Sequence, residues 1–276
     1  MLNKLKLAWS KTNRFYRVIF LFLLVELKLF PGGKIGFQCN DPALSHPFTG
    51  DTVNWKWLIV VTALLPLIVM LIIENQKDKT DLAKKKALTW YKEYLYGYLI
   101  NLTLVECLKF IVGSPRPHFF DTCSPKEALT CETSEYVSSY TCTKAHWLNQ
   151  SDRSFPSGHT SLAFHAGMFV IYYLQKRANH IHTKSVRTIQ LLCTVATLHC
   201  AVSRITDHRH HWWDVLAGVV IAAPILIYTI LRLCRNFECL TGKMNIVENQ
   251  NIENVVENLN NTLPNVGQTK IIENVD

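Results

Sequence analysis

The residues best suited to chemistry are two histidines in polar surroundings. His210 is followed four positions later by Asp214, and His159 directly follows Ser157 and Gly158. On one helix face, a carboxylate at that spacing can hold one imidazole nitrogen, fix the tautomer and stabilise the imidazolium form. The other nitrogen of His210 can then attack phosphorus and form a phosphohistidine, while His159 protonates the leaving oxygen and later deprotonates water.

Positive charges in the same stretches could bind a negatively charged phosphoryl group. Lys109, Arg116 and Arg204 can neutralise the equatorial oxygens of a phosphoryl group, the arginines as bidentate forks and the lysine as a point charge. Ser157 and Gly158 add a hydroxyl and backbone N–H donors, and the dipole at a helix start also favours an anion. Together these residues predict phosphoryl transfer.

Each stretch also has an ordinary structural interpretation. Lys109 and Arg116 are typical of interfacial anchors whose charged ends reach the lipid headgroups. The turn at 156–158 is a common helix cap, and the run of histidines around His210 would suit a metal site or a solvated loop. The catalytic interpretation is favoured because the stretches fall, in order, at the ends of predicted membrane helices on one side of the membrane.

Apolar blocks are the elements that must position these residues. The chain is 49% hydrophobic, and its apolar residues are concentrated in blocks that approach membrane-spanning length. Glu26 and Lys28 interrupt the first block, so an interfacial helix is its alternative interpretation. The third block carries Glu93, Glu106 and Lys109, which should face the bundle interior or the interface because intramembrane charge is costly. The blocks are Tyr16–Phe30, Trp57–Ile73, Thr89–Val112, Ser161–Leu174, Thr188–Ile205 and Val215–Leu233.

Basic clusters between the blocks predict the topology. By the positive-inside rule, both ends of the chain and the second and fourth connections are cytoplasmic. The expected fold is all-α, a polytopic membrane protein with six transmembrane helices and both termini cytoplasmic. We expect residues 1–240 to form one six-helix membrane domain and residues 241–276 to form a mobile cytoplasmic tail. The clusters are Lys4 to Arg17, Lys77 to Lys86, Lys176 to Arg187, and Arg232 with Arg235.

The remaining connections are then extracellular or lumenal, and two features agree with that placement. Asn149 begins an N-glycosylation acceptor sequence. Four cysteines fall in these loops, where disulfides can form, although the sequence leaves their pairing open. On the cytoplasmic side, Cys234 and Cys239 are candidates for palmitoylation, with ordinary free thiols as the commoner alternative. The loop cysteines are Cys39, Cys123, Cys131 and Cys142.

The charge distribution argues against nucleic acid as a partner. The net charge is +8, but the basic residues lie between apolar blocks instead of forming one stripe with interleaved aromatic residues. The sequence also shows no carboxylate cluster suited to magnesium, so no metal is expected. The bilayer and a phosphate-bearing substrate are the expected partners.

Three stretches together resemble the three-part signature of the type 2 phosphatidic acid phosphatases. They are Lys109 with Arg116-Pro117, Pro156-Ser157-Gly158-His159, and Ser203-Arg204 with His210 and Asp214. The resemblance covers roughly residues 15 to 235. Gly36 to Asp41 is similar to the animal lipid phosphate phosphatase (phospholipid phosphatase) subgroup, and Arg116 to Asp121 looks closest to its insect members of the Wunen type.

This resemblance implies a role for each matching residue. His210 would be the nucleophile, Asp214 its partner and His159 the general acid. It also implies an outward-facing active site, no divalent cation, inhibition by vanadate, and a homodimer. The implied substrates are phosphatidate, lysophosphatidate, sphingosine 1-phosphate or ceramide 1-phosphate, in the plasma membrane or, alternatively, an internal membrane. The implied phosphate-binding residues are Lys109, Arg116, Ser157, Gly158 and Arg204.

Three other functions remain open at this point. One is a catalytically inactive relative that binds lipid phosphates, although such relatives typically lack signature residues. Another is a phosphatase of the same superfamily that acts on a soluble ester, as glucose-6-phosphatase does. A transporter or channel is the third, and only the intramembrane charges of Glu106 and Lys109 favour it.

Overall fold

The computed structural model describes residues 13–27, 32–144, 148–178 and 181–238. The chain divides into two units, Met1–Phe237 and Glu238–Asp276. The first unit contains all the elements discussed below. The predicted tail at 241–276 and Cys239 lie outside the described residues.

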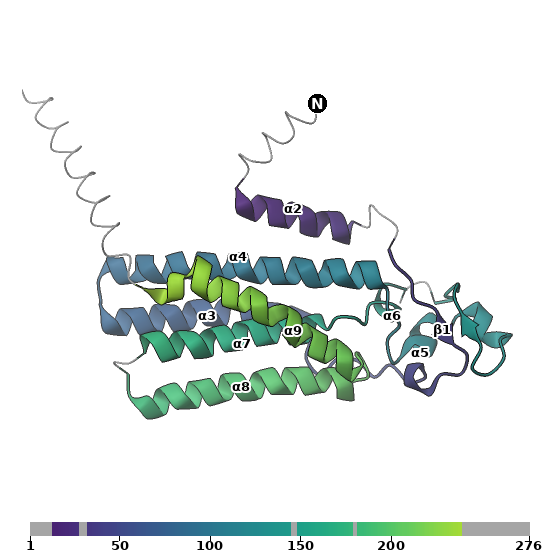
Figure 1. Ribbon diagram of the computed structural model, residues 1–276. Helices are drawn as coiled ribbons and strands as arrows, with labels where there is room; N and C mark the ends of the chain where they lie inside the picture. The colour runs from purple at the N-terminus through teal and green to yellow at the C-terminus, as the bar shows by residue number, and fades with distance from the viewer. Residues whose placement is uncertain (1–12, 28–31, 145–147, 179–180, 239–276) are drawn as a thin grey trace, which may run out of the picture. The chain divides into compact units, whose positions relative to one another are not determined.

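Five long helices form the bulk of the described part of the first unit; α3, α4, α7 and α8 run alongside one another, and α9 crosses them obliquely (Figure 1). The most central is α7, which contacts α3, α4, α8 and α9. A shorter helix, α2 (Arg14–Glu26), contacts α4. The long helices are α3 (Trp55–Lys77), α4 (Asp81–Val112), α7 (Gly158–Arg177), α8 (Thr183–Thr206) and α9 (Trp212–Tyr228), the last continued by the π-helical turn η4 (Thr229–Leu233) and then by η5 (Arg235–Phe237).

Local sequence explains where these helices begin and end. The Asn54 side chain caps α3 by accepting from the Lys56 N–H, and Ser157 caps α7 in the same way. Gly113 ends α4 with φ of 59°, a left-handed conformation that glycine adopts without steric cost. The predicted third block was too short, because α4 begins at Asp81 and its first turns include Lys84 to Lys86.

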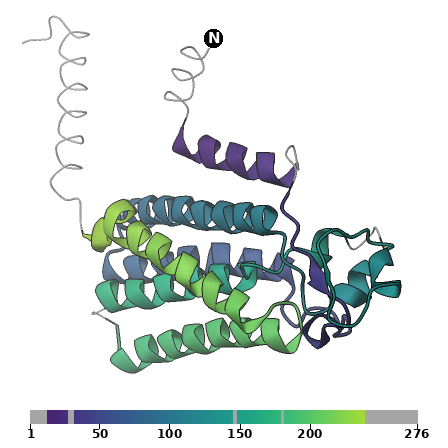
Figure 2. The ribbon, with the colours of Figure 1, turned by 45° about the vertical axis from the view of Figure 1, so that its right-hand side comes forward.

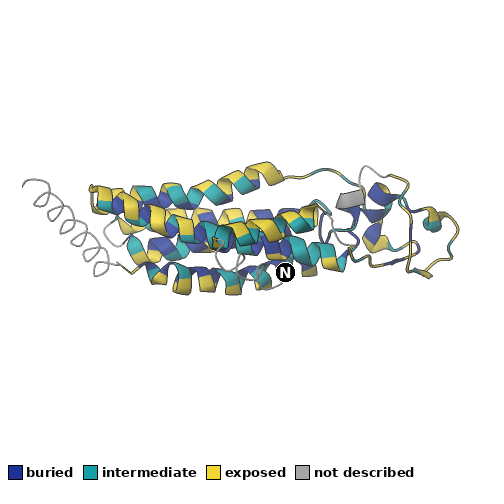
Figure 3. Ribbon diagram, turned by 90° about the horizontal axis from the view of Figure 1, so that it is seen from above, coloured by how far each residue is buried: buried dark blue, intermediate teal, exposed yellow. Residues whose placement is uncertain are grey.

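Four of the described helices are long and apolar enough to cross a membrane, namely α3, α4, α8 and Trp212–Leu233. Many apolar side chains on the long helices are exposed, and Figure 3 shows these positions in yellow beside buried ones in dark blue. The 20 residues of α7 suffice in length but include several polar side chains. The 13 residues of α2 span only about 20 Å at 1.5 Å per residue. The expectation of membrane helices is therefore confirmed, whereas six spans and cytoplasmic termini stay predictions.

Near the last turns of α3 and α7, a buried ion pair joins these two helices. Arg177 donates to both carboxylate oxygens of Glu74 at 2.8 and 2.7 Å, and the Tyr173 hydroxyl donates to the same carboxylate at 3.0 Å. The Arg177 guanidinium also lies over the Trp90 ring. Because a buried charge is tolerated only when paired and hydrogen-bonded, this contact fixes how the helices align.

The two long connections gather at the opposite end of the helices, which we call the site end (Figure 2). A two-residue antiparallel ladder, β1 (Phe37–Gln38) with β2 (Tyr136–Val137), joins them and is a small departure from the all-α prediction. The four loop cysteines form two disulfides, Cys39–Cys131 and Cys123–Cys142. The short helical elements here are η1 (Pro42–Leu44), α5 (Phe119–Cys123), η2 (Lys126–Leu129) and α6 (Leu148–Ser151).

Candidate active site

The helix ends that carry the predicted site residues meet at the site end. The backbone N–H of Ser157 donates to the carbonyl of Asp214 at 3.0 Å, which ties the start of α7 to the start of α9. The other residues follow from the helix boundaries. They are Lys109 in the last turn of α4, Gly158 and His159 in the first turn of α7, Arg204 in the last turn of α8, His210 between α8 and α9, and Arg116 after α4.

His210 is held by a backbone carbonyl. Its side chain is 3% exposed, and its Nδ1 lies 2.6 Å from the carbonyl oxygen of Ser154. A carbonyl only accepts, so Nδ1 carries the proton and Nε2 carries the lone pair. Burial lowers the pKa of His210 well below its usual value, and the charges of Arg116 and Lys109 lower it further. His210 is therefore a neutral imidazole at neutral pH, which is the form a nucleophile requires.

Asp214 does not hold His210 in the way that the sequence predicted. The helix α9 begins at Trp212, so His210 precedes it, and Nδ1 lies 3.8 Å from Asp214 Oδ2. That oxygen accepts instead from the Ser154 hydroxyl at 2.6 Å and from the backbone N–H of His211 at 2.9 Å. Asp214 thus lies close enough to stabilise a positive charge on His210, while Ser154 connects the two.

His159 is oriented by a second backbone carbonyl. Its Nε2 donates to the carbonyl oxygen of Val53, 3.1 Å away, in the segment that precedes α3. Nδ1 is then the nitrogen that can exchange a proton with a substrate. The two histidines therefore expose opposite ring nitrogens, Nε2 of His210 and Nδ1 of His159.

Gly158 makes room for Lys109. A Cβ atom added at Gly158 would lie 2.9 Å from Lys109 Nζ, so any side chain there would displace the ammonium group. Nζ also donates to Glu106 at 2.6 Å, and Arg153 lies 4.0 Å from the same carboxylate. The intramembrane charges of Glu106 and Lys109 thus compensate one another, as expected from the cost of burying them.

The side chains of Ser157 and Arg116 are engaged by the protein itself. The Ser157 hydroxyl lies 3.0 Å from the Thr160 hydroxyl and caps α7. The Arg116 guanidinium donates twice to the carbonyl of Arg153, at 3.3 and 3.1 Å. Burial, with the neighbouring charge of Arg209, lowers the pKa of Arg116 to about 9, which leaves the side chain charged at neutral pH.

Arg204 is fully buried between two carboxylates. It donates to Asp51 at 2.7 Å and to Asp207 at 2.8 Å, and its remaining contacts are to the hydroxyl of Ser203. Asp51 also forms an ion pair with Arg209, whose Nε lies 3.1 Å from Asp51 Oδ1. These pairs compensate the cost of burying a guanidinium, and they hold its plane in one orientation.

Comparison with known proteins identifies the family. The model of the PAP2 superfamily matches residues 90–237, which include Lys109, Arg116, His159, Arg204, His210 and Asp214. The chain belongs to the PAP2 superfamily.

Curated relatives within this superfamily carry phosphatase names. A Drosophila melanogaster protein named "Putative phosphatidate phosphatase" is 32% identical across 75% of this chain, which spans 62% of that relative's length. "Phospholipid phosphatase 1" of Mus musculus is 27% identical, with coverage of 74% of this chain and 76% of the relative. "Phospholipid phosphatase 2" of Bos taurus is also 27% identical. No solved structure matches the chain.

Several residues of this PAP2 site were not predicted. Asp207 and Arg209 lie inside the third signature stretch, where their charge between Arg204 and His210 was a usable signal. Ser154 and Asp51 lie in irregular segments, and nothing in their sequence context distinguishes them from other loop residues. The carbonyl groups that orient both histidines belong to the backbone, so no residue type encodes them.

An apolar groove adjoins the PAP2 site on the α2 side. Its volume is about 440 Å³, and Lys109, Gly158 and His159 lie in its lining. The other lining residues come from α2, α3, α4 and α7, and they are predominantly apolar, namely Phe22, Glu26, Trp55, Leu58, Ile59, Leu102, Glu106 and Leu162.

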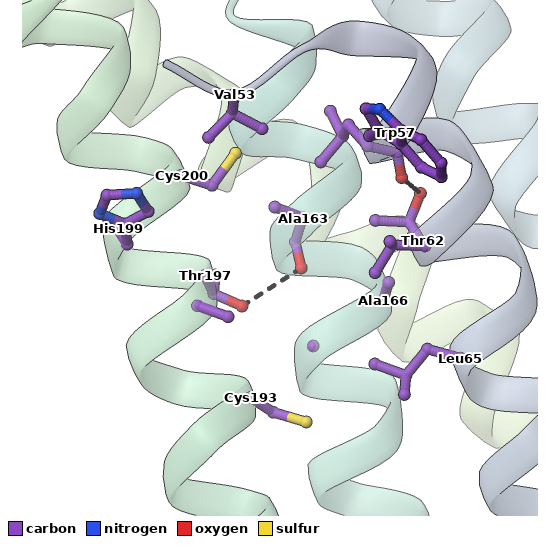
Figure 4. A pocket seen from close by; sticks show the side chains of 14 residues that line it. Val53, Trp57, Thr62, Leu65, Ala163, Ala166, Cys193, Thr197, His199 and Cys200 are labelled. Carbon is purple, nitrogen blue, oxygen red and sulfur yellow. Dashed lines mark hydrogen bonds between the residues drawn. The ribbon is translucent and has the colours of Figure 1, made fainter.

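A second apolar pocket, with a volume of about 280 Å³, is also lined by Leu58 and lies between α3, α7 and α8 (Figure 4). Val53 and Cys200 line it, and the Cys200 thiol is 3.7 Å from the carbonyl of His159. Its lining includes neither Lys109 nor His159. The first groove is therefore the one connected to the charged site residues.

Proposed function

We propose that this protein is an integral membrane lipid phosphate phosphatase that works through a phosphohistidine on His210. The observation that carries the proposal is the state of His210, which is buried and neutral, with its Nε2 lone pair free of a proton. Lys109, Arg116 and His159 surround it with the charge and the proton donor that phosphoryl transfer needs.

The reaction follows from these positions in two steps. Nε2 of His210 attacks phosphorus, and the bond to the lipid oxygen breaks as that oxygen takes a proton from Nδ1 of His159, which enters this step protonated on both ring nitrogens. His159 then removes a proton from water, whose oxygen attacks phosphorus and breaks the P–N bond. Phosphate leaves and His210 returns to its neutral form. Asp214, 3.8 Å from Nδ1, stabilises the positive charge on the ring during the intermediate.

Phosphate binding requires Lys109 to exchange partners. In the resting site its ammonium group is neutralised by Glu106, 2.6 Å away. A substrate phosphate of higher charge would take over that contact, and the phosphate would also meet the first-turn N–H groups of α7. Arg116 and Arg204 add positive charge around the same point, while Ser157 secures the helix start that presents those N–H groups.

The apolar groove favours a lipid over a soluble ester. Its polar end is formed by Lys109, Gly158 and His159, and its walls suit a hydrocarbon chain. Phosphatidate, lysophosphatidate, sphingosine 1-phosphate and ceramide 1-phosphate all combine a phosphate monoester with such a chain. The phosphatidate and phospholipid phosphatase names of the relatives agree with this class.

Six spans with both termini cytoplasmic and an outward-facing active site complete the proposal. Two disulfides at the site end are compatible with an extracellular or lumenal face, where oxidising conditions prevail. The plasma membrane is the proposed location, and a homodimer is the proposed assembly. Asn149 remains the proposed glycosylation acceptor; its side chain is outside the described residues.

Hydrolysis is proposed to need no divalent cation. Across residues 13–27, 32–144, 148–178 and 181–238, no group of three or more His, Cys, Asp and Glu side chains is arranged to hold a metal ion. Activity retained in EDTA is the expected result, and activity restored only by added magnesium would contradict the proposal.

Phosphate release by the purified protein in detergent micelles tests the proposed function. Wild type should hydrolyse short-chain phosphatidate and lysophosphatidate, and glucose 6-phosphate should neither be hydrolysed nor compete. Saturable lipid binding without phosphate release would instead identify a non-catalytic binding protein. Preferential hydrolysis of glucose 6-phosphate would identify a soluble-ester phosphatase.

A further inference from the structure

Three consecutive residues before α3 each contact a different part of the catalytic signature. Asp51 accepts from Arg204, Thr52 bonds Asp207, and the carbonyl of Val53 accepts from His159. We propose that the segment 51–53 is a positioning element of the active site, which fixes the side chains of Arg204 and His159 relative to each other. The proposal concerns residues outside the signature and rests on the proposed function for its activity readouts.

Asp51 fixes the orientation of the Arg204 guanidinium. Its Oδ1 accepts a hydrogen bond from Arg204 Nη1 at 2.7 Å and pairs with the charge of Arg209, whose Nε lies 3.1 Å away. The Arg204 side chain is 1% exposed and that of Asp51 is 24% exposed. A guanidinium without this carboxylate would keep its bonds to Asp207 and Ser203 but lose the contact that fixes the other edge of its plane.

Thr52 fixes Asp207, the second carboxylate on Arg204. Its backbone N–H donates to Asp207 Oδ2 at 2.8 Å, and its hydroxyl donates to Oδ1 at 2.6 Å. Both oxygens of Asp207 are therefore held by one residue, while Oδ2 also accepts from Arg204. The turn that leads from α8 to His210 is thereby joined to the segment before α3.

Val53, the next residue, connects the segment to His159. Because its carbonyl accepts a hydrogen bond from His159 Nε2, 3.1 Å away, the segment keeps the proton on Nε2 and leaves Nδ1 facing the substrate. Figure 4 shows Val53 beside Cys200 in the lining of the second pocket. Movement of Thr52 away from Asp207 would thus release the orientation of His159.

Substitution of Thr52 tests the proposal with matched controls. Thr52→Val removes the hydroxyl bond to Asp207, Thr52→Ser keeps it, and Thr49→Val makes the same change at an exposed position just before the segment. Turnover number, KM and thermal unfolding midpoint are measured on short-chain phosphatidate. We expect Thr52→Val and Asp51→Asn to lower the turnover number by about tenfold to a hundredfold, as misplaced catalytic groups do. Thr52→Ser and Thr49→Val should stay within about threefold of wild type.

A readout independent of activity separates this proposal from the proposed function. Mass spectrometry would follow the rate at which diethyl pyrocarbonate modifies His159, which should rise in Thr52→Val but not in Thr49→Val. Wild-type turnover numbers in both Thr52→Val and Asp51→Asn, with unchanged His159 reactivity, would overturn the positioning role. The positioning role would also be overturned if the turnover number fell only in proportion to the unfolding midpoint and Thr52→Ser did not restore it. A folded wild type without turnover would refute the proposed function, whereas the reactivity of His159 would still test the segment.

Discussion

At the scale of single residues, the two histidines owe their roles to backbone carbonyl groups. The carbonyl of Ser154 accepts a hydrogen bond from His210 Nδ1–H, and the carbonyl of Val53 accepts one from His159 Nε2–H. Each contact selects one tautomer and so decides which ring nitrogen meets the substrate. The acidic partner expected for His210, Asp214, lies in a supporting position behind Ser154.

Ser154→Ala tests that arrangement. The substitution removes the hydroxyl that donates to Asp214 but leaves the carbonyl that holds His210. We expect the turnover number to fall about tenfold with little change in KM, since a supporting contact is lost while the tautomer stays fixed. Ser139→Ala, at an exposed loop position, is the control. A loss as complete as that of His210→Ala would show that the hydroxyl, and not the carbonyl, orients the nucleophile.

His118 predicts how stability depends on pH. Its Nε2 accepts from Arg209 at 3.3 Å and its Nδ1 lies 3.0 Å from the Thr122 hydroxyl, so the folded state needs a neutral ring. Burial, followed by the charges of Arg116 and Arg209, lowers its pKa to about 3. On acidification, His118 of the unfolded chain therefore binds a proton at a higher pH than His118 of the folded protein does. The free energy of unfolding falls as pH drops from about 6.5 toward 3, by up to about 1.4 kcal/mol per pH unit.

Thermal unfolding in detergent between pH 7.5 and pH 4.5 checks this slope. His118→Gln can supply one acceptor and one donor without titrating, so its unfolding midpoint should fall less steeply on acidification than that of wild type. Equal slopes would mean that His118 is not the residue that titrates.

At the scale of elements, the site depends on the close approach of α9 to α7. A Cβ atom at Gly218 would lie 2.6 Å from the carbonyl oxygen of Ser157, a backbone atom that cannot rotate away. Gly97 is similarly close to Thr229, where a Cβ would lie 2.0 Å from a hydroxyl oxygen, but that contact is away from the site. Substitutions at the two glycines can therefore distinguish a general loss of helix packing from a misalignment of the site.

Gly218→Ala should lower the turnover number by about a hundredfold, because it separates the segment of His210 and Asp214 from the start of α7. Gly97→Ala should lower the unfolding midpoint and leave the turnover number of the folded protein near wild type. Assays well below both unfolding midpoints check this. Equal losses of turnover in the two variants would contradict a specific role for the α7–α9 contact.

The elements also show what sequence can predict. Predominantly apolar runs placed the centres of α3, α8 and α9 correctly, because a membrane helix must satisfy its backbone internally and cover it with apolar side chains. The signature residues were assigned to the correct helix ends for the same reason. The segment 51–53 was not predicted as part of the site, since its contacts to Arg204 and His159 depend on long-range folding that no local pattern records.

At the scale of the whole molecule, the proposed topology places the site end outside the cytoplasm. Expression of wild type and Asn149→Gln in cells that glycosylate tests this placement. Wild type should migrate more slowly on a gel than Asn149→Gln, and glycosidase treatment should remove the difference. A tag on the N-terminus should be protected from protease in intact cells. A protease-accessible N-terminal tag would contradict cytoplasmic termini.

The most direct test of the account is to trap the phosphorylated enzyme. Wild type would be mixed briefly with ³²P-labelled lysophosphatidate, quenched in alkali, and digested for peptide mapping. A phosphohistidine on His210 should give an acid-labile, alkali-stable label on the peptide that contains this residue. The label should be absent from His210→Ala, which should also release no phosphate. A label on another residue, or substantial turnover by His210→Ala, would contradict the histidine mechanism.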